Sequence, residues 1–156
     1  WGADLSAEEI KRLQKRFHLK KTKEIFSFFI LTSLERLKPG GTLSFVLPVS
    51  FLNVKAHQEI RKSIFSNYKV TSVVELDEKF SGVLTKSVLL NVQKTKPSPE
   101  HEVALTSQKI KIKNSELLKS ELLAISLNND DLSLKIISAI EKGSGEIHGW
   151  TSSLWL

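Results

Sequence analysis

The apolar positions near the start of the chain recur at helical spacing and then give way to short strand-like runs. A helix is predicted over Ala7–Phe17, because Ser6 and Glu9 have the spacing of a capping box. Two further helices are predicted over residues 22–37 and 55–66. Their buried stripes are expected to be Phe26, Phe29, Ile30, Ser33, Leu34 and Leu37 in the first, and Ala56, Ile60, Ile64 and Phe65 in the second.

Three apolar runs are predicted to be strands of an α/β sheet. Residues 42–47 follow the helix-stopping turn Lys38-Pro39-Gly40-Gly41, and their composition suits a strand that is buried on both faces and ends at Pro48. Residues 70–76 follow a long connection that contains a helix, which predicts a parallel crossover. Residues 87–92 follow a short connection without helical period, which predicts an antiparallel hairpin.

The proline-containing stretch KTKPSPE marks a boundary in the chain. We therefore expect residues 1–94 to form one unit and residues 95–156 to be a linker and a further segment. Candidate strands follow at 103–106, 110–112 and 122–127. The chain contains no methionine, even at its first position, and we interpret it as a piece of something longer.

Composition excludes several classes of protein. There is no cysteine for a disulfide or a thiolate site, and the four histidines lack metal-ligand spacing. The chain has no G-x-S-x-G elbow, and its Gly40-Gly41 pair fits neither a phosphate loop nor a dinucleotide fingerprint. No apolar run approaches the ~20 residues of a membrane span, and no signal peptide is present, so a cytoplasmic location without membrane contact is expected.

Positive charge is concentrated close to the N-terminus. The formal net charge is +6, which favours a polyanionic partner. One interpretation of the basic segment is contact with a nucleic-acid backbone, and the other is a solvated helix face. The residues concerned are Lys11, Arg12, Lys15, Arg16, Lys20, Lys21 and Lys23.

Phe80 lies in the polar stretch LDEKFSGVLT between the second and third predicted strands. A large aromatic side chain in such a loop is often a plug that packs beneath it. The alternative is an exposed platform on which a planar ligand such as a nucleobase stacks.

Two stretches carry a resemblance to a known family: EIFSFFILTSLERLKPGGTLSFVLPVSFLNVKAHQEIRKSIF and VVELDEKFSGVLTKSVLLNVQK. They resemble the adenine-N6 DNA methyltransferases of restriction-modification systems over roughly residues 1–94. Trp1-Gly2 looks like the tail of that family's N-P-P-W-G motif. The resemblance implies the C-terminal half of a class I (Rossmann-like) S-adenosylmethionine-dependent methyltransferase sheet, whose last strand runs antiparallel.

The resemblance also implies roles for single residues. Trp1 would stack on the flipped target adenine, and Phe80 would pack on that base from another side. Phe29 would lie beside the adenine of S-adenosylmethionine, and Pro48 would close the strand at the lip of the pocket. The glycine-rich cofactor loop, the acidic residue for the ribose and the Asn-Pro-Pro of the catalytic motif would belong to an N-terminal half outside this chain.

The resulting expectation is part of a DNA methyltransferase that transfers a methyl group from S-adenosylmethionine to adenine N6, inactive as this fragment alone. Its partners would be DNA, the N-terminal half of the catalytic domain and a C-terminal target-recognition domain. Residues 95–156 would be the linker and the start of the connection to that target-recognition domain. Two alternatives stay open: a methyltransferase of RNA or of protein glutamine, and a non-catalytic DNA-binding or specificity module on a degenerate methyltransferase fold.

Overall fold

The computed structural model describes residues 4–76, 86–105 and 110–127. The described residues form both helices and strands, and residues 25–76 have the alternating order of an α/β fold. Short 3₁₀ turns, η1 (Val49–Leu52) and η2 (Lys55–His57), join the first strand to the helix that follows it. The elements are α1 (Ala7–Phe17), α2 (Ile25–Arg36), β1 (Thr42–Pro48), α3 (Gln58–Asn67), β2 (Lys69–Leu76), β3 (Ser87–Gln93), β4 (Glu102–Leu105), β5 (Ile110–Lys113) and α4 (Asn114–Leu117).

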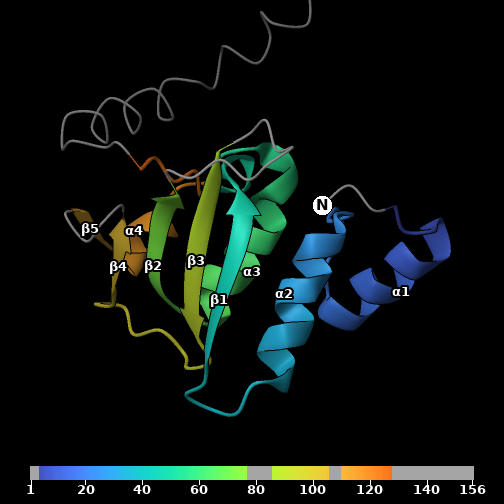
Figure 1. The fold of residues 1–156 in the computed structure, drawn as a ribbon, viewed down its shortest axis with the longest axis horizontal. Coiled ribbons are helices and arrows are strands. Elements are labelled where there is room, and N and C mark those ends of the chain that lie inside the picture. The colour runs from blue at the N-terminus through green and yellow to red at the C-terminus, as the bar shows by residue number, and fades with distance from the viewer. Residues whose placement is uncertain (1–3, 77–85, 106–109, 128–156) are drawn as a thin grey trace, which may run out of the picture.

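The strands form one mixed sheet in the order β1-β3-β2-β4-β5 (Figure 1). Strand β3 lies antiparallel to both β1 and β2, so β1 and β2 run in the same direction. Phe45 and Val73 both pair with Leu90, which fixes the register of the three strands. The predicted parallel crossover and antiparallel hairpin are therefore confirmed, with the hairpin strand inserted between the two parallel ones.

Helices α2 and α3 lie on one side of the sheet, and no described helix covers the face turned toward the viewer in Figure 1. Helix α1 packs beside α2, where the rings of Phe17 and Phe28 stack with centroids 6.3 Å apart. On the covered face, the fully buried side chains of Leu47, Leu90 and Val73 meet the helices. This single apolar layer is the core of the described part of the chain.

Local sequence signals account for the ends of α1 and α2. The hydroxyl of Ser6 accepts from the backbone N–H of Glu9, whose carboxylate accepts from the N–H of Ser6, so the predicted capping box is present. Gly40 has φ +79°, a left-handed conformation that glycine adopts without strain. Helix α2 begins at Ile25, later than residue 22, because Thr22 belongs to a loop that is held by the side chain of Glu59.

Several predicted burial patterns and one predicted strand are wrong. Residues of β1 are not buried on both faces, because β1 is an edge strand of the described sheet and one face is uncovered. Phe29 and Ala56 are exposed, since helical periodicity identifies a face but not whether anything covers it. Residues 122–127 form no strand.

The uncovered face carries a row of small polar side chains that bond to one another. Asn91 sits between Ser44 and Ser72: the hydroxyl of Ser44 donates to Asn91 Oδ1 at 2.6 Å, and Asn91 Nδ2 donates to the hydroxyl of Ser72 at 2.9 Å. Ala104 of β4 is the next residue across the sheet. These cross-strand bonds satisfy polar groups that neither helix could reach.

The sheet continues beyond residue 94. Strand β4 pairs in parallel with β2, and β5 pairs antiparallel with β4. Leu123 and Ile125 then bury their side chains in the same core as the first strands. The boundary expected after residue 94 stays a prediction, but the described residues up to 127 pack on the sheet. No helix in the described ranges is long and apolar enough to cross a membrane.

Candidate functional site

The carboxyl end of β1 is lined by a cluster of rings, formed by Phe26, Phe51 and His57. Phe51 follows β1 in η1, and its ring lies edge-on to that of Phe26 with centroids 6.3 Å apart. His57 packs edge-on against Phe26 at 5.2 Å and stacks on Phe51 at 6.4 Å. These contacts fix the start of α2 beside the end of β1, where open α/β sheets bind their ligands.

His57 is held in its neutral form by this packing. The side chain is 8% exposed, and its Nδ1 has no hydrogen-bond partner among the described residues. Burial is the largest effect and lowers the pKa of His57 below its ordinary value. The carboxylate of Glu24 raises this pKa and the charge of Arg61 lowers it, so the net shift is downward. The ring therefore serves as an apolar wall and not as a cation at neutral pH.

Phe29 is exposed, so its predicted burial is wrong. The side chain is 58% exposed, while its neighbours Phe28 and Ile30 are buried at 3% and 0%. It lies on the same helix as Phe26, three residues further along. Pro48, which was predicted at the lip of the pocket, is the half-buried last residue of β1. The ligand roles of both residues stay predictions.

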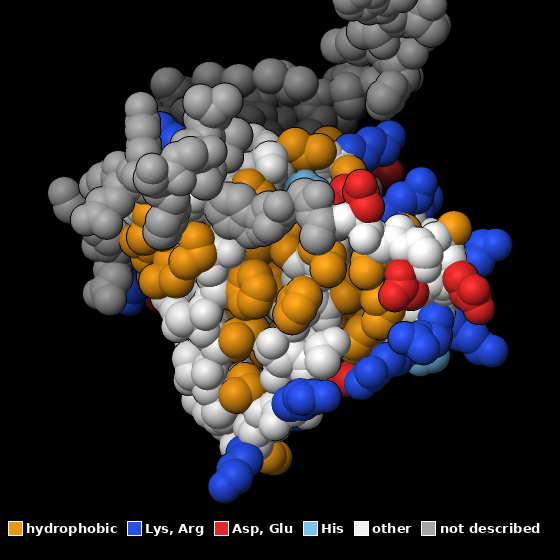
Figure 2. All heavy atoms as spheres, turned by 45° about the vertical axis from the view of Figure 1, so that its right-hand side comes forward, with side chains coloured by type: hydrophobic (Ala, Val, Ile, Leu, Met, Phe, Trp, Pro, Cys, Tyr) orange, Lys and Arg blue, Asp and Glu red, His pale blue; other side chains and the backbone are white. Residues whose placement is uncertain are grey.

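An apolar area extends over β1 and α2 (Figure 2). Figure 2 shows hydrophobic side chains gathered over β1 and α2, with lysine and arginine side chains toward the right and lower margins. In β1, Leu43, Phe45 and Val46 are only half-buried, and Val54 in the connection after β1 is 42% exposed. An apolar area of this kind, next to an open strand edge, is typical of an interaction surface.

Two of the predicted base-contacting residues, Trp1 and Phe80, lie outside the described residues. Their roles stay predictions.

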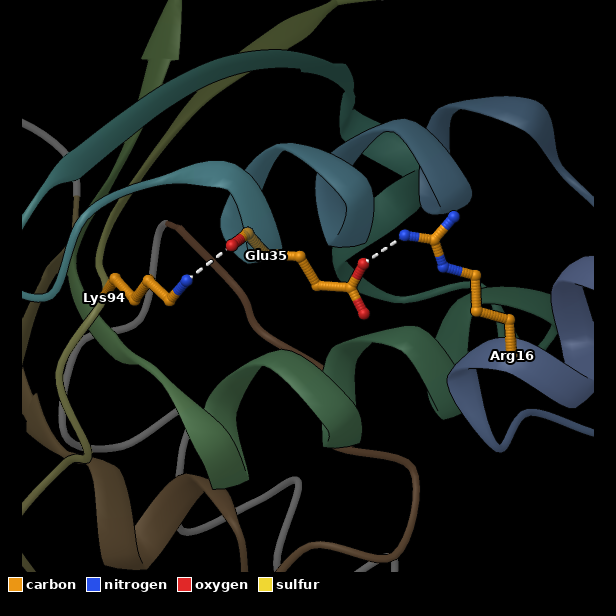
Figure 3. Close-up of polar contacts among 3 residues, drawn as sticks. All are labelled: Arg16, Glu35 and Lys94. Carbon is orange, nitrogen blue, oxygen red and sulfur yellow. Dashed lines mark hydrogen bonds and ion pairs between the residues drawn. The ribbon is translucent and has the colours of Figure 1, made fainter.

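The seven lysine and arginine side chains predicted to contact nucleic acid are all exposed. Helix α1 presents Lys11, Arg12, Lys15 and Arg16, and the loop after it presents Lys20, Lys21 and Lys23. Arg16 donates to the carboxylate of Glu35 at 2.6 Å and lies over the ring of Phe17 at 5.1 Å. Figure 3 shows that Glu35 faces Arg16 with its carboxylate, while its backbone carbonyl accepts from Lys94 Nζ.

Arg61 is a structural residue that the sequence analysis did not single out. Its side chain is fully buried at 0% exposure. The guanidinium donates to the carbonyls of Phe51 and Val54 after β1, and to those of Leu122 and Leu123 at the end of the described chain. Burial lowers the pKa of Arg61 to about 10, so it is still charged at neutral pH. One signal was available: Arg61 lies beside Ile60 and three residues before Ile64, on the inward face of the predicted helix.

A hollow of about 560 Å³ lies elsewhere, at the outer face of β2 and β4. Lys69, Glu100, His101 and Lys111 line it, so its walls are mixed in charge. It contains none of the predicted site residues, and it is open to solvent. Among the residues that the structure describes, no group of three His, Asp or Glu side chains could hold a metal ion.

The sequence of the chain is similar to that of a known methyltransferase. A type II methyltransferase, M.VspI from Vibrio sp. (strain 343), is 24% identical over 107 residues, which cover 69% of this chain and 26% of that protein. The chain therefore spans about a quarter of the length of this relative.

Two solved structures are similar to the chain. One is the methyltransferase subunit of a type I restriction-modification system from Streptococcus thermophilus, with a TM-score of 0.49, 20% identity and coverage of 90% of this chain and 29% of that one. The other is described as a class I S-adenosylmethionine-dependent methyltransferase from Listeria monocytogenes, with a TM-score of 0.45, 22% identity and coverage of 76% and 32%.

The sequence profile of the Eco57I restriction-modification methylases matches residues 3–81, which is just over half of the chain. That match includes the basic helix, the exposed phenylalanine of α2, and β1 with the ring cluster at its end. The chain belongs to the Eco57I restriction-modification methylase family.

Proposed function

We propose that this chain is the C-terminal half of the catalytic domain of a DNA methyltransferase, which transfers a methyl group from S-adenosylmethionine to adenine N6. The observation that carries the proposal is the match of residues 3–81 to a family of restriction-modification methylases. The specificity for adenine N6 is supported by the resemblance of Trp1-Gly2 to the tail of an N-P-P-W-G motif.

The exposed ring of Phe29 fits the cofactor. It is 58% exposed on a helix whose adjacent residues are buried, and a flat apolar ring is suited to stacking on a planar adenine. When bound, S-adenosylmethionine supplies the methyl group from its sulfonium. The contribution of this chain would be to hold the cofactor's adenine against α2, while the glycine-rich loop and the acidic ribose ligand come from the N-terminal half.

The open edge of β1 supports a further strand as its neighbour. Strand β1 pairs with β3 on one side only, and its apolar residues Leu43, Phe45 and Val46 are half-buried among the described residues. An apolar edge strand of this kind is prone to pair with another strand. We assign that place to the N-terminal half of the catalytic domain, and we expect a target-recognition domain to follow the chain.

The exposed basic segment supports contact with DNA. Lysine and arginine side chains that neutralise phosphates provide affinity without reading sequence. Target adenines must be flipped from the duplex to be methylated, and Trp1 and Phe80 are proposed to hold the flipped base. An enzyme with this substrate is expected to work in the cytoplasm.

The proposal is tested by transfer of tritium from methyl-labelled S-adenosylmethionine to plasmid DNA by the full-length protein. Phe29→Ala is expected to raise the KM for the cofactor with little loss of stability, because an exposed ring contributes little to the core. Val54→Ala, which truncates another exposed hydrophobic residue of the described part of the chain, is the matched control and should leave the KM unchanged. Absence of transfer to DNA, or label in RNA or protein instead, would overturn the proposal.

A further inference from the structure

The loop between α1 and α2 is wrapped around one carboxylate, that of Glu59. The backbone N–H of Lys20 donates to Glu59 Oε1 at 2.6 Å. The backbone N–H groups of Lys21 and Thr22 donate to Oε2 at 2.8 and 2.9 Å, and the Thr22 hydroxyl donates to the same oxygen at 2.9 Å. Successive amides that converge on one anion form a nest, and here a side chain of the same protein fills it.

Glu59 is fixed as an anion in this position. It lies in the first turn of α3, where a negative charge is favoured by the helix dipole. Burial by itself raises the pKa of Glu59, but the donors from Lys20, Lys21 and Thr22 outweigh this effect and hold the pKa below its ordinary value. Thr22 is 1% exposed, so this side of the nest is buried in the protein.

The arrangement separates backbone from side chains in the basic loop. The amides of Lys20 and Lys21 are used by Glu59, whereas the side chains of Lys20, Lys21 and Lys23 are exposed. In the described part of the chain, Glu59 forms no ion pair with a lysine or arginine side chain. The charge of Glu59 therefore orders the loop through its backbone and does not pair with the lysine side chains of that loop.

Glu35 provides the opposite case. Its carboxylate pairs directly with the side chain of Arg16, in an ion pair whose two side chains are 54% exposed for Arg16 and 42% exposed for Glu35. In Figure 3 the carboxylate of Glu35 binds the guanidinium of Arg16, which is the group that a phosphate would otherwise approach. Glu35 competes with an anionic ligand, and Glu59 does not.

We propose that Glu59 is a positioning residue for nucleic-acid binding, which holds the 20–23 loop so that its lysine side chains meet the phosphate backbone together. The inference rests on the proposed contact between the basic segment and DNA. It predicts that removal of the Glu59 charge weakens binding, although the protein then becomes more positive. Ordering the loop before binding removes a cost that a free loop would incur on meeting DNA.

The test compares two substitutions that make the same chemical change. Glu35→Gln and Glu59→Gln are introduced into the full-length protein, and binding to a fluorescein-labelled mixed-sequence DNA duplex is measured by anisotropy between low and moderate salt. Glu35→Gln should tighten binding, because Arg16 is released. Glu59→Gln should weaken binding several-fold and reduce the slope of log K against log salt by about 0.9 for each phosphate that is no longer neutralised.

Thr22→Val is the second variant, since it removes one donor of the nest without changing any charge. It should weaken binding in the same direction as Glu59→Gln, and it keeps the proposal testable if Glu59→Gln fails to fold. Circular dichroism of each variant checks folding. If Glu59→Gln tightens DNA binding by the same factor as Glu35→Gln, the positioning role of Glu59 is refuted.

A double variant, Lys20→Ala with Lys21→Ala, separates the role of Glu59 from the role of the loop itself. If it weakens DNA binding while Glu59→Gln and Thr22→Val do not, only the role of Glu59 is refuted. If it leaves binding unchanged, the interaction between this loop and DNA is itself refuted, and the role of Glu59 with it.

Discussion

Replacement of Arg61 by methionine should loosen the end of the described chain from the sheet. The guanidinium joins four backbone carbonyls: those of Phe51 and Val54 after β1 and those of Leu122 and Leu123 further along the chain. Methionine fills a similar volume and keeps the apolar packing, but it offers no donor. The substitution thus isolates the hydrogen bonds from the packing.

The expected decrease in stability arises because the four carbonyls lose their hydrogen-bond donor. Each buried acceptor without a donor costs about 1–3 kcal/mol, so four such groups would cost about 4–12 kcal/mol, which is comparable with the total stability of many domains. Removal of the buried charge relieves several kcal/mol of desolvation, which offsets part of this cost. The difference between these two effects is expected to be a net decrease of about 3–5 kcal/mol in the free energy of unfolding.

Hydrogen exchange measured by mass spectrometry gives a local readout of this decrease. The backbone N–H of Ile125 donates to the carbonyl of Leu52 at 2.9 Å, so this amide reports whether the two segments stay joined. A decrease of about 4 kcal/mol at this site would accelerate exchange of peptides covering residues 121–127 by roughly 1,000-fold.

Two further substitutions control the experiment. Arg61→Lys should fall between the wild type and Arg61→Met, because an ammonium keeps the charge but lacks the fork of the guanidinium. Lys62→Met removes a positive charge at the next position and should change stability by less than about 0.5 kcal/mol. If Arg61→Met exchanges at the wild-type rate, the guanidinium does not hold these segments together, and the reasoning is refuted.

Two other predictions concern pH and backbone conformation. Because burial lowers the pKa of His57, this side chain binds a proton more readily in the unfolded chain than in the folded protein. The contribution of neutral His57 to stability should therefore be complete above about pH 6.5 and fall as the pH decreases below that value. Urea unfolding between pH 5 and 8 should show this fall, and His57→Phe should lessen it; equal slopes for both proteins would contradict the assignment. Gly40→Ala should cost about 1 kcal/mol, because φ is +79° although the added Cβ meets nothing within 4 Å. Thermal unfolding measures this cost, and an unchanged midpoint would show that the turn relaxes.

The local signals in the sequence predicted the direction of the first three strands and the start of α1. Loop length decides whether two strands can be antiparallel, and the capping box of Ser6 and Glu9 acts within one helical turn. Such features depend on residues close together in the chain. They are therefore accessible without knowledge of the tertiary structure.

Long-range pairings were not predictable in the same way. The parallel pairing of β4 with β2 joins Ala104 to Ser72, and no local pattern specifies that partner. The four carbonyls around Arg61 come from segments far apart in the sequence. The exposure of Phe29 was missed for a related reason, because an apolar position on a helix does not reveal whether the protein covers it.

The product of the full-length enzyme tests the central claim most directly. After incubation with S-adenosylmethionine and unmethylated plasmid DNA, the DNA is digested to nucleosides and analysed by mass spectrometry. A methyltransferase of the proposed specificity produces N6-methyldeoxyadenosine, and heat-denatured protein produces none. Methylation of cytosine instead, or unmodified DNA together with methylated RNA or glutamine, would contradict the account.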